Sequence, residues 1–277
     1  MAEPLFIDHA KGRTWLKWHR GRRQAGDMEF APARILQGMR AGARVEVDLV
    51  RHAGGGFAVL HDETLDRGTD GTGRVDQASA DQIRTLRRRD DAGGVTDVGV
   101  ALLGDLCAAL AGSLPDTALL QLDMKENADQ IGDDDVAAFA ASVGPVARHI
   151  IVSGGDAAMV ARLQAAAPAV MTGYDPCHFG ALTRLRESRD YAGFVAQALA
   201  DAGQAQMIYL DYHAVLQADY DRFDLIAAFG AAGRRVDAYT LQAVTPQTVA
   251  IARHLMALGV DQITTDDPLG LWAACQA

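Results

Sequence analysis

Three carboxylates stand in apolar runs that predict buried strands. Glu46 and Asp48 lie two residues apart and share one strand face, because side chains alternate between the two faces. Asp123 and Lys125 share a face of a later strand in the same way. If these strands are neighbours, the three carboxylates converge, and unpaired they would repel one another and be costly to bury. One divalent cation, Mg²⁺ or Ca²⁺, would neutralise such an oxygen-rich cluster; ion pairs with Lys125 and nearby arginines are the structural alternative.

Two histidines and an arginine are expected beside this cluster. His61 follows an apolar run that comes after the glycine triplet 54–56, and the short connection predicts a β-hairpin in which Asp48 faces His61. His19 and Arg20 end the first apolar run. Two imidazoles can divide the general-base and general-acid roles near neutral pH, and cations with a metal can neutralise a phosphoryl group. These residues favour cleavage of a phosphodiester, because a glycosidase would use two carboxylates without clustered cations.

Alternating strands and helices must hold these residues. Nine apolar runs have the length of strands, and stretches with helical spacing or alanine-rich composition separate most of them. The runs are Thr14–Trp18, Val45–Val50, Phe57–Leu60, Ala118–Met124, His149–Val152, Ala169–Gly173, Met207–Tyr212, Arg235–Thr240 and Gln262–Thr265. Because Phe57–Leu60 belongs to the hairpin, eight strands remain, each followed by a helix or a cap. We expect an α/β fold, a single (β/α)8 TIM barrel with an extra β-hairpin strand after strand two.

The sequence carries no signal for a second domain. We expect residues 1–277 to form one phosphodiesterase barrel domain, with an N-terminal arm at residues 1–13 and an excursion over the barrel mouth at residues 62–98. Barrel active sites lie at the carboxyl ends of the strands. Polar residues at the predicted ends of strands four to seven could line the substrate pocket: Ser153, Asp175, Asp211, His213 and Tyr239. His178, which follows strand five, could also reach the barrel mouth.

Composition narrows the range of partners. The 277 residues are 49% hydrophobic and 22% charged, with a formal net charge of −10. No basic run predicts nucleic-acid binding, and an acidic protein attracts a phosphate ester only through local cations or a metal. No apolar stretch approaches 18 residues, the first thirty residues lack the apolar core of a signal peptide, and Cys107, Cys177 and Cys275 form neither a metal-binding nor a disulfide pattern. We expect a soluble cytoplasmic protein with a small-molecule phosphodiester substrate and no membrane partner; homo-oligomer formation stays open.

The same residues resemble the glycerophosphodiester phosphodiesterase family, within the PI-PLC-like phosphodiesterase superfamily. The family motif H-R-G is matched at residues 19–21, and E-x-D is matched at residues 46–48. The pattern H-D-x-x-L-D-R-x-T-x-G-x-G is matched at residues 61–73. Weaker matches occur at residues 119–125 and 236–268, the latter including a close relative of G-V-D-x-I-x-T-D-x-P. The combination of motifs, order and spacing is specific over about residues 17–75.

The resemblance implies a role for each matched residue. The acid–base pair would be His19 and His61, the phosphate ligands Arg20 and Lys125, and the metal ligands Glu46, Asp48 and Asp123. The family fold is a (β/α)8 barrel with a divalent metal. The reaction implied is hydrolysis of a glycerophosphodiester to glycerol 3-phosphate and an alcohol.

The sequence departs from the family pattern in several motifs. Of the family's P-E-N-T only Glu29 is kept, which adds Glu29 to the possible substrate pocket. Asp123 replaces the glutamate of I-E-I-K, which shortens the third metal ligand by about 1.5 Å. Gly154 replaces the phenylalanine of S-F and opens room in the pocket, and Tyr239 replaces a tryptophan.

These departures leave the substrate open. A sugar or inositol phosphodiester is the alternative that keeps the fold and the chemistry. A lipid-directed lyase of the same superfamily would usually be secreted and carry disulfides, a pattern that this sequence lacks. Alternatives of another class are a non-catalytic barrel that binds phosphorylated metabolites and a different metalloenzyme barrel, such as an aldolase. The sequence does not choose between Mg²⁺ and Ca²⁺, or between direct attack by water and a cyclic phosphate intermediate.

Overall fold

Eight parallel strands close into a barrel. The computed structural model describes residues 3–276. Strand β2 pairs with β12 on one side and with β3 on the other, which closes the ring. In ring order the strands are β2 (Gly12–Trp18), β3 (Arg44–Arg51), β7 (Leu119–Met124), β8 (Ile150–Ser153), β9 (Met171–Tyr174), β10 (Met207–Asp211), β11 (Arg235–Leu241) and β12 (Gln262–Thr265). Each overlaps one of the apolar runs, so the predicted (β/α)8 barrel is confirmed.

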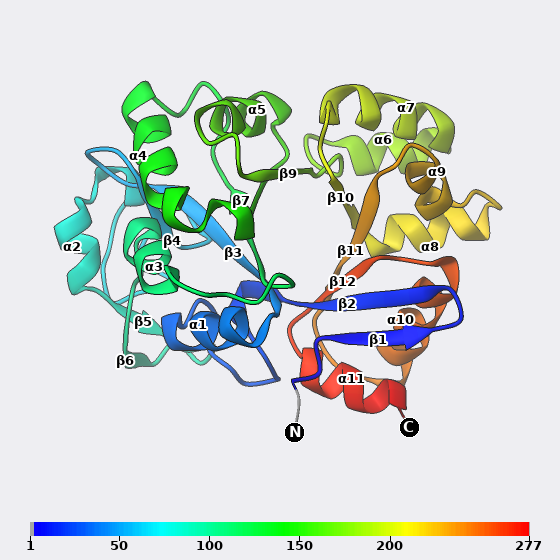
Figure 1. Ribbon diagram of the computed structural model, residues 1–277, viewed down its shortest axis with the longest axis horizontal. Helices are drawn as coiled ribbons and strands as arrows, with labels where there is room; N and C mark the ends of the chain where they lie inside the picture. The colour runs from blue at the N-terminus through cyan, green and yellow to red at the C-terminus, as the bar shows by residue number, and fades with distance from the viewer. Residues whose placement is uncertain (1–2, 277) are drawn as a thin grey trace.

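Helices follow the strands and cover the outside of the ring (Figure 1). They are α1 (Pro32–Ala41), α3 (Leu103–Leu110), α4 (Asp133–Val143), α5 (Ala157–Ala166), α6 (Ala181–Ser188), α7 (Tyr191–Ala202), α8 (Tyr212–Tyr220), α9 (Leu225–Ala231), α10 (Pro246–Leu258) and α11 (Pro268–Gln276). Local sequence sets several of their ends. Asp156 accepts hydrogen bonds from the first amides of α5, and Pro246 opens α10, where no amide hydrogen is needed.

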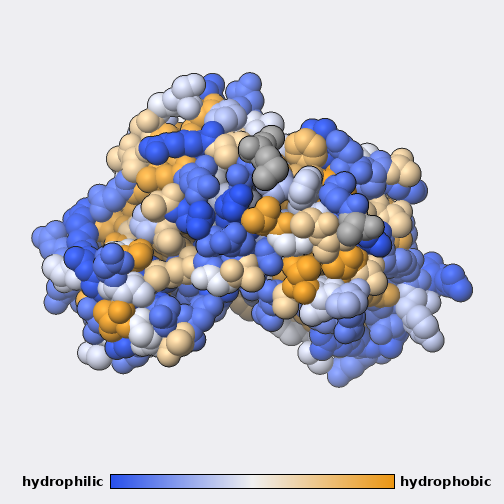
Figure 2. Space-filling view, turned by 90° about the horizontal axis from the view of Figure 1, so that it is seen from below, coloured by the Kyte–Doolittle hydropathy of each residue, from blue (hydrophilic) through white to orange (hydrophobic). Residues whose placement is uncertain are grey.

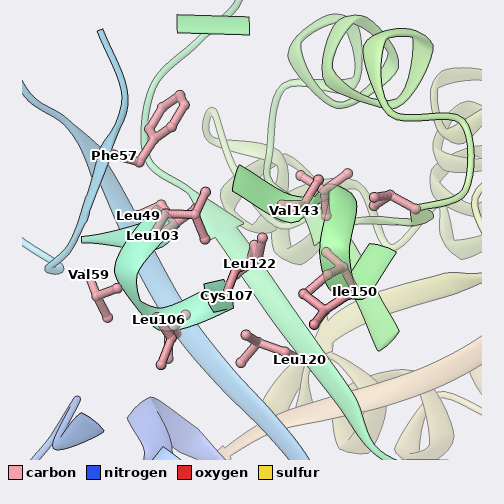
Figure 3. Packing of buried hydrophobic residues seen from close by; sticks show 14 of the residues in the cluster. Leu49, Phe57, Val59, Leu103, Leu106, Cys107, Leu120, Leu122, Val143 and Ile150 are labelled. Carbon is pink, nitrogen blue, oxygen red and sulfur yellow. The ribbon is translucent and has the colours of Figure 1, made fainter. Parts of the chain in front are cut away.

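Side-chain alternation separates an apolar outer face of the barrel from a polar inner face. Val47 and Leu49 of β3 and Leu122 of β7 belong to a buried apolar cluster outside the ring. In Figure 3 this cluster fills the space between the strands and the helices α3 and α4. Burying one such side chain contributes about 1.5–3 kcal/mol. The intervening residues of β3, Glu46 and Asp48, point to the inner side, where they line a cavity.

The predicted hairpin forms, but its register is shifted by one residue. Strand β4 (Phe57–Val59) runs antiparallel to β3, and Leu49 pairs with Val59. The prediction that Asp48 faces His61 is therefore wrong, because His61 lies beyond the end of β4. The hydrogen bond that closes the turn joins residues 52 and 56, so the turn is centred on Gly54, whose φ of 85° favours glycine.

Two segments outside the ring have more structure than the sequence indicated. The segment predicted as an N-terminal arm contains β1 (Phe6–His9), which pairs antiparallel with β2. The excursion at residues 62–98 contains the 3-10 helix η2 (Val75–Gln77), α2 (Ala80–Thr85) and a two-stranded ribbon of β5 (Arg87–Arg89) and β6 (Val95–Gly99). The ribbon strands lack an apolar face, which is why periodicity did not predict them. A small apolar cluster packs residues of η2 and α2 against the β3–β4 hairpin.

The face of the molecule seen in Figure 2 carries mixed polarity. In Figure 2 hydrophilic residues predominate and hydrophobic residues form separate patches rather than one band. Within residues 3–276, no helix combines the length and the apolar character needed to cross a lipid bilayer.

Candidate active site

One cavity at the carboxyl ends of the barrel strands gathers the residues selected for chemistry. Its volume is about 210 Å³. Its lining includes seven predicted residues: His19, Arg20, Glu46, Asp48, His61, Asp123 and Lys125. They follow β2, lie on β3, follow β4 and lie at the end of β7, so only the closed barrel brings them together.

The three carboxylates converge as predicted. Oxygen atoms of Glu46, Asp48 and Asp123 lie within 4.8 Å of one another, because β3 and β7 are parallel neighbours in a register that pairs Asp48 with Asp123. Lys125 Nζ lies 2.6 Å from Asp48 Oδ1 and 2.6 Å from Asp123 Oδ2. Arg20 Nε lies 3.2 Å from Asp48 Oδ2. The ion pairs considered as the structural alternative thus occur inside the cluster itself.

These cations do not fully compensate the buried negative charge. Burial, and then the charge of Glu46, raises the pKa of Asp48 to about 7. Burial, and then the charge of Asp123, raises the pKa of Glu46. Burial also opposes ionisation of Asp123, but Lys125 and a hydrogen bond from Ser153 bring the pKa of Asp123 below its ordinary value. The cluster is therefore under electrostatic stress that a further cation would relieve.

The donor set fits a hard divalent cation. Asp48 Oδ2 is buried and accepts no hydrogen bond from residues 3–276, although Arg20 Nε lies 3.2 Å away without the geometry of one; this is costly for a carboxylate oxygen. Mg²⁺ and Ca²⁺ bind groups of carboxylate oxygens. Glu46, Asp48 and Asp123 are the residues that could hold such an ion.

His19 is held by a carboxylate on the far side of its ring. It begins the 3-10 helix η1 (His19–Gly21) directly after β2, and its Nδ1 lies 2.5 Å from Asp266 Oδ1. An ionised carboxylate only accepts hydrogen bonds, so Nδ1 carries the proton and Nε2, 4.0 Å from Glu46 Oε2, is available for chemistry. Arg20 has a left-handed φ of 52°, and its N–H donates to Glu46 Oε2 at 2.8 Å. The tight turn therefore joins the histidine to the carboxylate cluster.

His61 is held in a similar way. Its Nδ1 lies 2.7 Å from Asp62 Oδ1, and Arg67 Nη2 donates to the same oxygen at 2.9 Å. The Arg67 hydrogen bond lowers the pKa of Asp62 to about 2, so the carboxylate stays ionised beside the imidazole. Nε2 of His61 is again the nitrogen left for chemistry. Both histidines thus combine a carboxylate-bound Nδ1 with a ring that lines the cavity.

Glu29 lies behind the cavity and organises arginines. Its carboxylate lies 2.8 Å from Arg20 Nη1, 3.6 Å from Arg88 Nη2 and 3.8 Å from Arg67 Nη1. Although burial opposes its ionisation, these guanidinium groups hold the pKa of Glu29 below its ordinary value. Glu29 therefore positions Arg20 and is not among the residues that line the cavity.

The other residues suggested for the substrate pocket divide into three groups. Asp175 and Tyr239 line the cavity. Ser153 is buried beside it and donates a hydrogen bond to Asp123 at 2.9 Å. The structure does not bring Asp211 and His213 into the cavity: Asp211 caps the first turn of α8, and His213 is exposed on that helix and lines a different cavity. Helix α8 begins directly after β10, which directs both side chains to the helix end.

Several residues of the cavity were not selected from the sequence. Lys17, Gln121 and Thr264 form part of its lining. Lys17 lies two residues before His19, and Gln121 lies two residues before Asp123. Strand alternation therefore contained the signal that could have found them.

His178 lines the cavity and packs on Gly155, while the room that the sequence indicated at Gly154 is taken up by other residues. Its Nε2 lies 3.0 Å from Asp175 Oδ2, and its ring lines the cavity. A Cβ atom on Gly155 would lie 2.6–2.7 Å from the His178 side chain, so the ring is accommodated only beside a glycine. A Cβ atom on Gly154 would instead meet Met159 at 3.0 Å. The space gained by small residues at 154 and 155 is thus occupied by packing within the chain.

Comparison with known proteins identifies a family. The model of the glycerophosphoryl diester phosphodiesterase family matches residues 33–269. A search of curated proteins found no match. A glycerophosphodiester phosphodiesterase from Agrobacterium tumefaciens str. C58 is 26% identical, with 95% of this chain and 100% of that chain covered at a TM-score of 0.64.

Two more distant structures share the fold. One is a glycerophosphoryl diester phosphodiesterase homologue from Silicibacter pomeroyi DSS-3, at 23% identity, 95% and 93% coverage of the two chains and a TM-score of 0.71. The other is an Oleispira antarctica phosphodiesterase in complex with the product sn-glycerol-3-phosphate, at 19% identity, 95% and 96% coverage and a TM-score of 0.63. Because the family model spans most of the sequence, the chain belongs to the glycerophosphoryl diester phosphodiesterase family and is a phosphoric diester hydrolase.

Proposed function

We propose that this enzyme hydrolyses a glycerophosphodiester to glycerol phosphate and an alcohol, with one divalent cation and two-histidine acid–base catalysis. The observation that carries the proposal is the single cavity in which His19 and His61 meet a cluster of three carboxylates. Arg20 and Lys125 line the same cavity and supply positive charge. An acidic protein needs such a local concentration of cations to attract a phosphodiester.

The substrate phosphate is positioned by cationic side chains. Arg20 offers a guanidinium that can bind two phosphate oxygens, and Lys125 offers an ammonium group. Glu46, Asp48 and Asp123 would hold Mg²⁺ or Ca²⁺, which would supply Lewis-acid stabilisation of the charge that develops on the phosphoryl oxygens. Glu29 keeps the Arg20 guanidinium in place through its 2.8 Å contact.

The two imidazoles divide the proton transfers. Each has Nδ1 bound to a carboxylate, Asp266 for His19 and Asp62 for His61, which leaves each Nε2 to exchange a proton with the substrate. One Nε2 accepts the proton of the nucleophile, and the other donates a proton to the leaving alkoxide. The nucleophile is either water or the 2-hydroxyl of the glycerol unit, and these two routes differ in whether a cyclic phosphate forms.

The glycerophosphodiester is favoured over the sugar or inositol phosphodiester by the position of the pocket residues. Of the five strand-end residues suggested for the substrate pocket, two, Asp211 and His213, lie outside the cavity and cannot bind a larger polyhydroxylated group there. The room expected at Gly154 is also taken up by packing.

A cytoplasmic location remains part of this proposal and rests on the three unpaired cysteines.

A ³¹P NMR time course tests the reaction. Glycerophosphocholine, glycerophosphoethanolamine, glycerophosphoinositol and a glucosyl phosphodiester are each incubated with the enzyme and Mg²⁺, Ca²⁺ or EDTA. We expect the glycerophosphodiesters to give a phosphomonoester signal with one or both metals and no product in EDTA. A transient cyclic phosphate signal would establish attack by the 2-hydroxyl. Absence of any turnover with either metal would leave the chain a phosphometabolite-binding barrel and overturn the proposal.

Variants test the assignment of the two histidines. His19→Ala and His61→Ala should each lower kcat by about 10²–10⁴-fold. His254→Ala is the matched control, because His254 is exposed on α10 and pairs only with Asp219 within the part of the chain that the structure describes. Wild-type kcat in either active-site variant would refute the acid–base roles.

A further inference from the structure

A buried series of hydrogen bonds runs from Lys17 of β2 to the carboxylate cluster. Lys17 Nζ donates a hydrogen bond to Gln121 Oε1. Gln121 Nε2 donates to Ser153 Oγ at 2.9 Å, and Ser153 Oγ donates to Asp123 Oδ1 at 2.9 Å. Lys17, Gln121 and Ser153 are only 3%, 6% and 0% exposed, and we refer to these three residues as the Lys17 chain.

The lower end of the Lys17 chain is anchored by a buried ion pair. Lys17 Nζ lies 3.0 Å from Asp237 Oδ2, and Asp237 is fully buried. Asp237 also accepts hydrogen bonds from Thr264, at 2.6 Å, and from Gln262. The carboxylate balances the lysine charge, and its several donors prevent it from turning. Lys17 therefore presents a fixed donor to Gln121.

The charged ends determine the direction of every hydrogen bond between them. A lysine ammonium can only donate, so the Gln121 group that faces it must be the amide oxygen. The Gln121 amide nitrogen then faces Ser153 and donates to its hydroxyl oxygen. The hydroxyl hydrogen of Ser153 is left to point at Asp123, whose carboxylate can only accept. Only this arrangement gives each of the four groups a suitable partner. Turning the Gln121 amide around would face its NH₂ group to the lysine and draw the Ser153 hydroxyl hydrogen away from Asp123.

This direction fixes the Asp123 carboxylate. Ser153 occupies one site of Oδ1, while Lys125 Nζ binds Oδ2 at 2.6 Å. The two oxygens are thus held from different residues, and the carboxylate is not free to rotate. In that orientation it contributes an oxygen to the group with Glu46 and Asp48 in which all atoms lie within 4.8 Å of one another.

We propose that Ser153 is a positioning residue for metal binding: Lys17 and Gln121 direct its hydroxyl hydrogen to Asp123, so that the Asp123 carboxylate is oriented toward the cation site. This inference rests on the metal in the proposed function. The physical reason is preorganisation: a carboxylate already held in its ligating orientation loses less rotational freedom when the cation binds. Loss of a hydrogen-bond partner of a metal ligand typically weakens metal binding by about 10–100-fold.

Metal affinity measured by isothermal titration calorimetry, with MgCl₂ or CaCl₂ alone and no substrate, tests the proposal. Ser153→Ala removes the donor to Asp123, and we expect Kd to rise about 10–100-fold for the ion that the wild-type enzyme binds more tightly. Gln121→Glu keeps the size of the side chain but makes it accept from both neighbours, so the Ser153 hydroxyl turns away from Asp123. We expect that variant to weaken metal binding similarly.

Thr14→Val is the matched control. Thr14 is fully buried and donates to Val260 O at 2.7 Å, so this substitution removes a buried hydroxyl that has no link to Asp123. Its Kd should stay within about twofold of wild type, while urea unfolding reports the stability of all three variants. Rescue of metal affinity by Ser153→Thr, which restores a hydroxyl, would support a positioning role.

The outcomes separate this inference from the proposed function. If the wild-type enzyme binds metal and Ser153→Ala binds it with the same Kd, the positioning role is refuted and the metal site stands. If Thr14→Val weakens metal binding as much as Ser153→Ala, the effect is general to buried hydroxyls and the inference is also refuted. If the wild-type enzyme binds neither ion, the metal part of the proposed function fails and this inference fails with it.

Discussion

Removing one carboxylate from the cluster should make the metal-free protein more stable. Asp48 is 2% exposed, and burial followed by the charge of Glu46 raises its pKa to about 7. In the unfolded chain an aspartate has a pKa of about 3.9. The folded protein therefore holds its proton more tightly than the unfolded chain does, so the metal-free protein loses stability as the pH rises from about 4 to about 7.

The size of this effect on the free energy of unfolding follows from the difference between the folded and unfolded pKa values of Asp48. Each pH unit between them corresponds to about 1.4 kcal/mol. Asp48 therefore opposes folding by about 4 kcal/mol at pH 8, where it is ionised, and by about 1–2 kcal/mol at pH 5, where it must take up a proton on folding. Asp48→Asn removes this charge but keeps an oxygen for Lys125, while its NH₂ group faces the Arg20 guanidinium, which offsets part of the gain. We expect the variant to be about 2 kcal/mol more stable than wild type at pH 8 and no more stable at pH 5.

Urea unfolding in EDTA between pH 5 and pH 8 measures this difference. The exposed Asp116→Asn variant, on the loop before β7, controls for the loss of an aspartate as such and should show no pH-dependent difference. In saturating Mg²⁺ or Ca²⁺ the order should reverse, because wild type binds the ion and the Asn variant lacks one ligand. A stability difference between Asp48→Asn and wild type that does not change with pH would refute the argument.

Contacts around the site and in the core give three further predictions. Asp266→Asn removes the carboxylate 2.5 Å from His19 Nδ1, so kcat in steady-state assays should fall about 10–100-fold with little change in KM. An unchanged kcat would mean that this contact does not support catalysis. Glu29→Gln leaves buried guanidinium groups without a counter-charge and should lower the free energy of unfolding by about 3 kcal/mol at pH 7, whereas a loss below about 0.5 kcal/mol in urea unfolding would contradict the burial argument. Phe139→Ala removes a fully buried ring and should cost about 3–5 kcal/mol in the same assay with kcat unchanged, so a selective loss of activity at full stability would be inconsistent with a core role.

The strands of the barrel were predictable because each is a short apolar run, and the polar residues at their ends were predictable because strand alternation defines which residues share a face. The β1 strand and the β5–β6 ribbon were not, because they lie outside the ring and need no continuous apolar face. The hairpin register was missed by one residue, since three consecutive glycines allow more than one turn centre and only the hydrogen bonds around Gly54 select among them.

The candidate site shows the same division. The spacing of Glu46 and Asp48 predicted a shared face, and the register of β3 with β7 then brings Asp123 to them. Asp211 was selected as a strand-end residue, but helix α8 begins immediately after it and uses the side chain as a cap. A strand-end position therefore predicts nearness to the mouth, while the direction of the side chain depends on whether a helix or a loop comes next in the chain.

The sequence by itself determined the barrel class, the family resemblance and the residue types of the site, because these depend on periodicity and on local spacing. Only the tertiary structure decided which polar residues support the site from behind. Lys17, Gln121 and Ser153 come from three different strands, and Asp266 reaches His19 across 247 positions of sequence. Such contacts require ring closure, because hydrogen bonds depend on distances of about 3 Å that chain order does not encode.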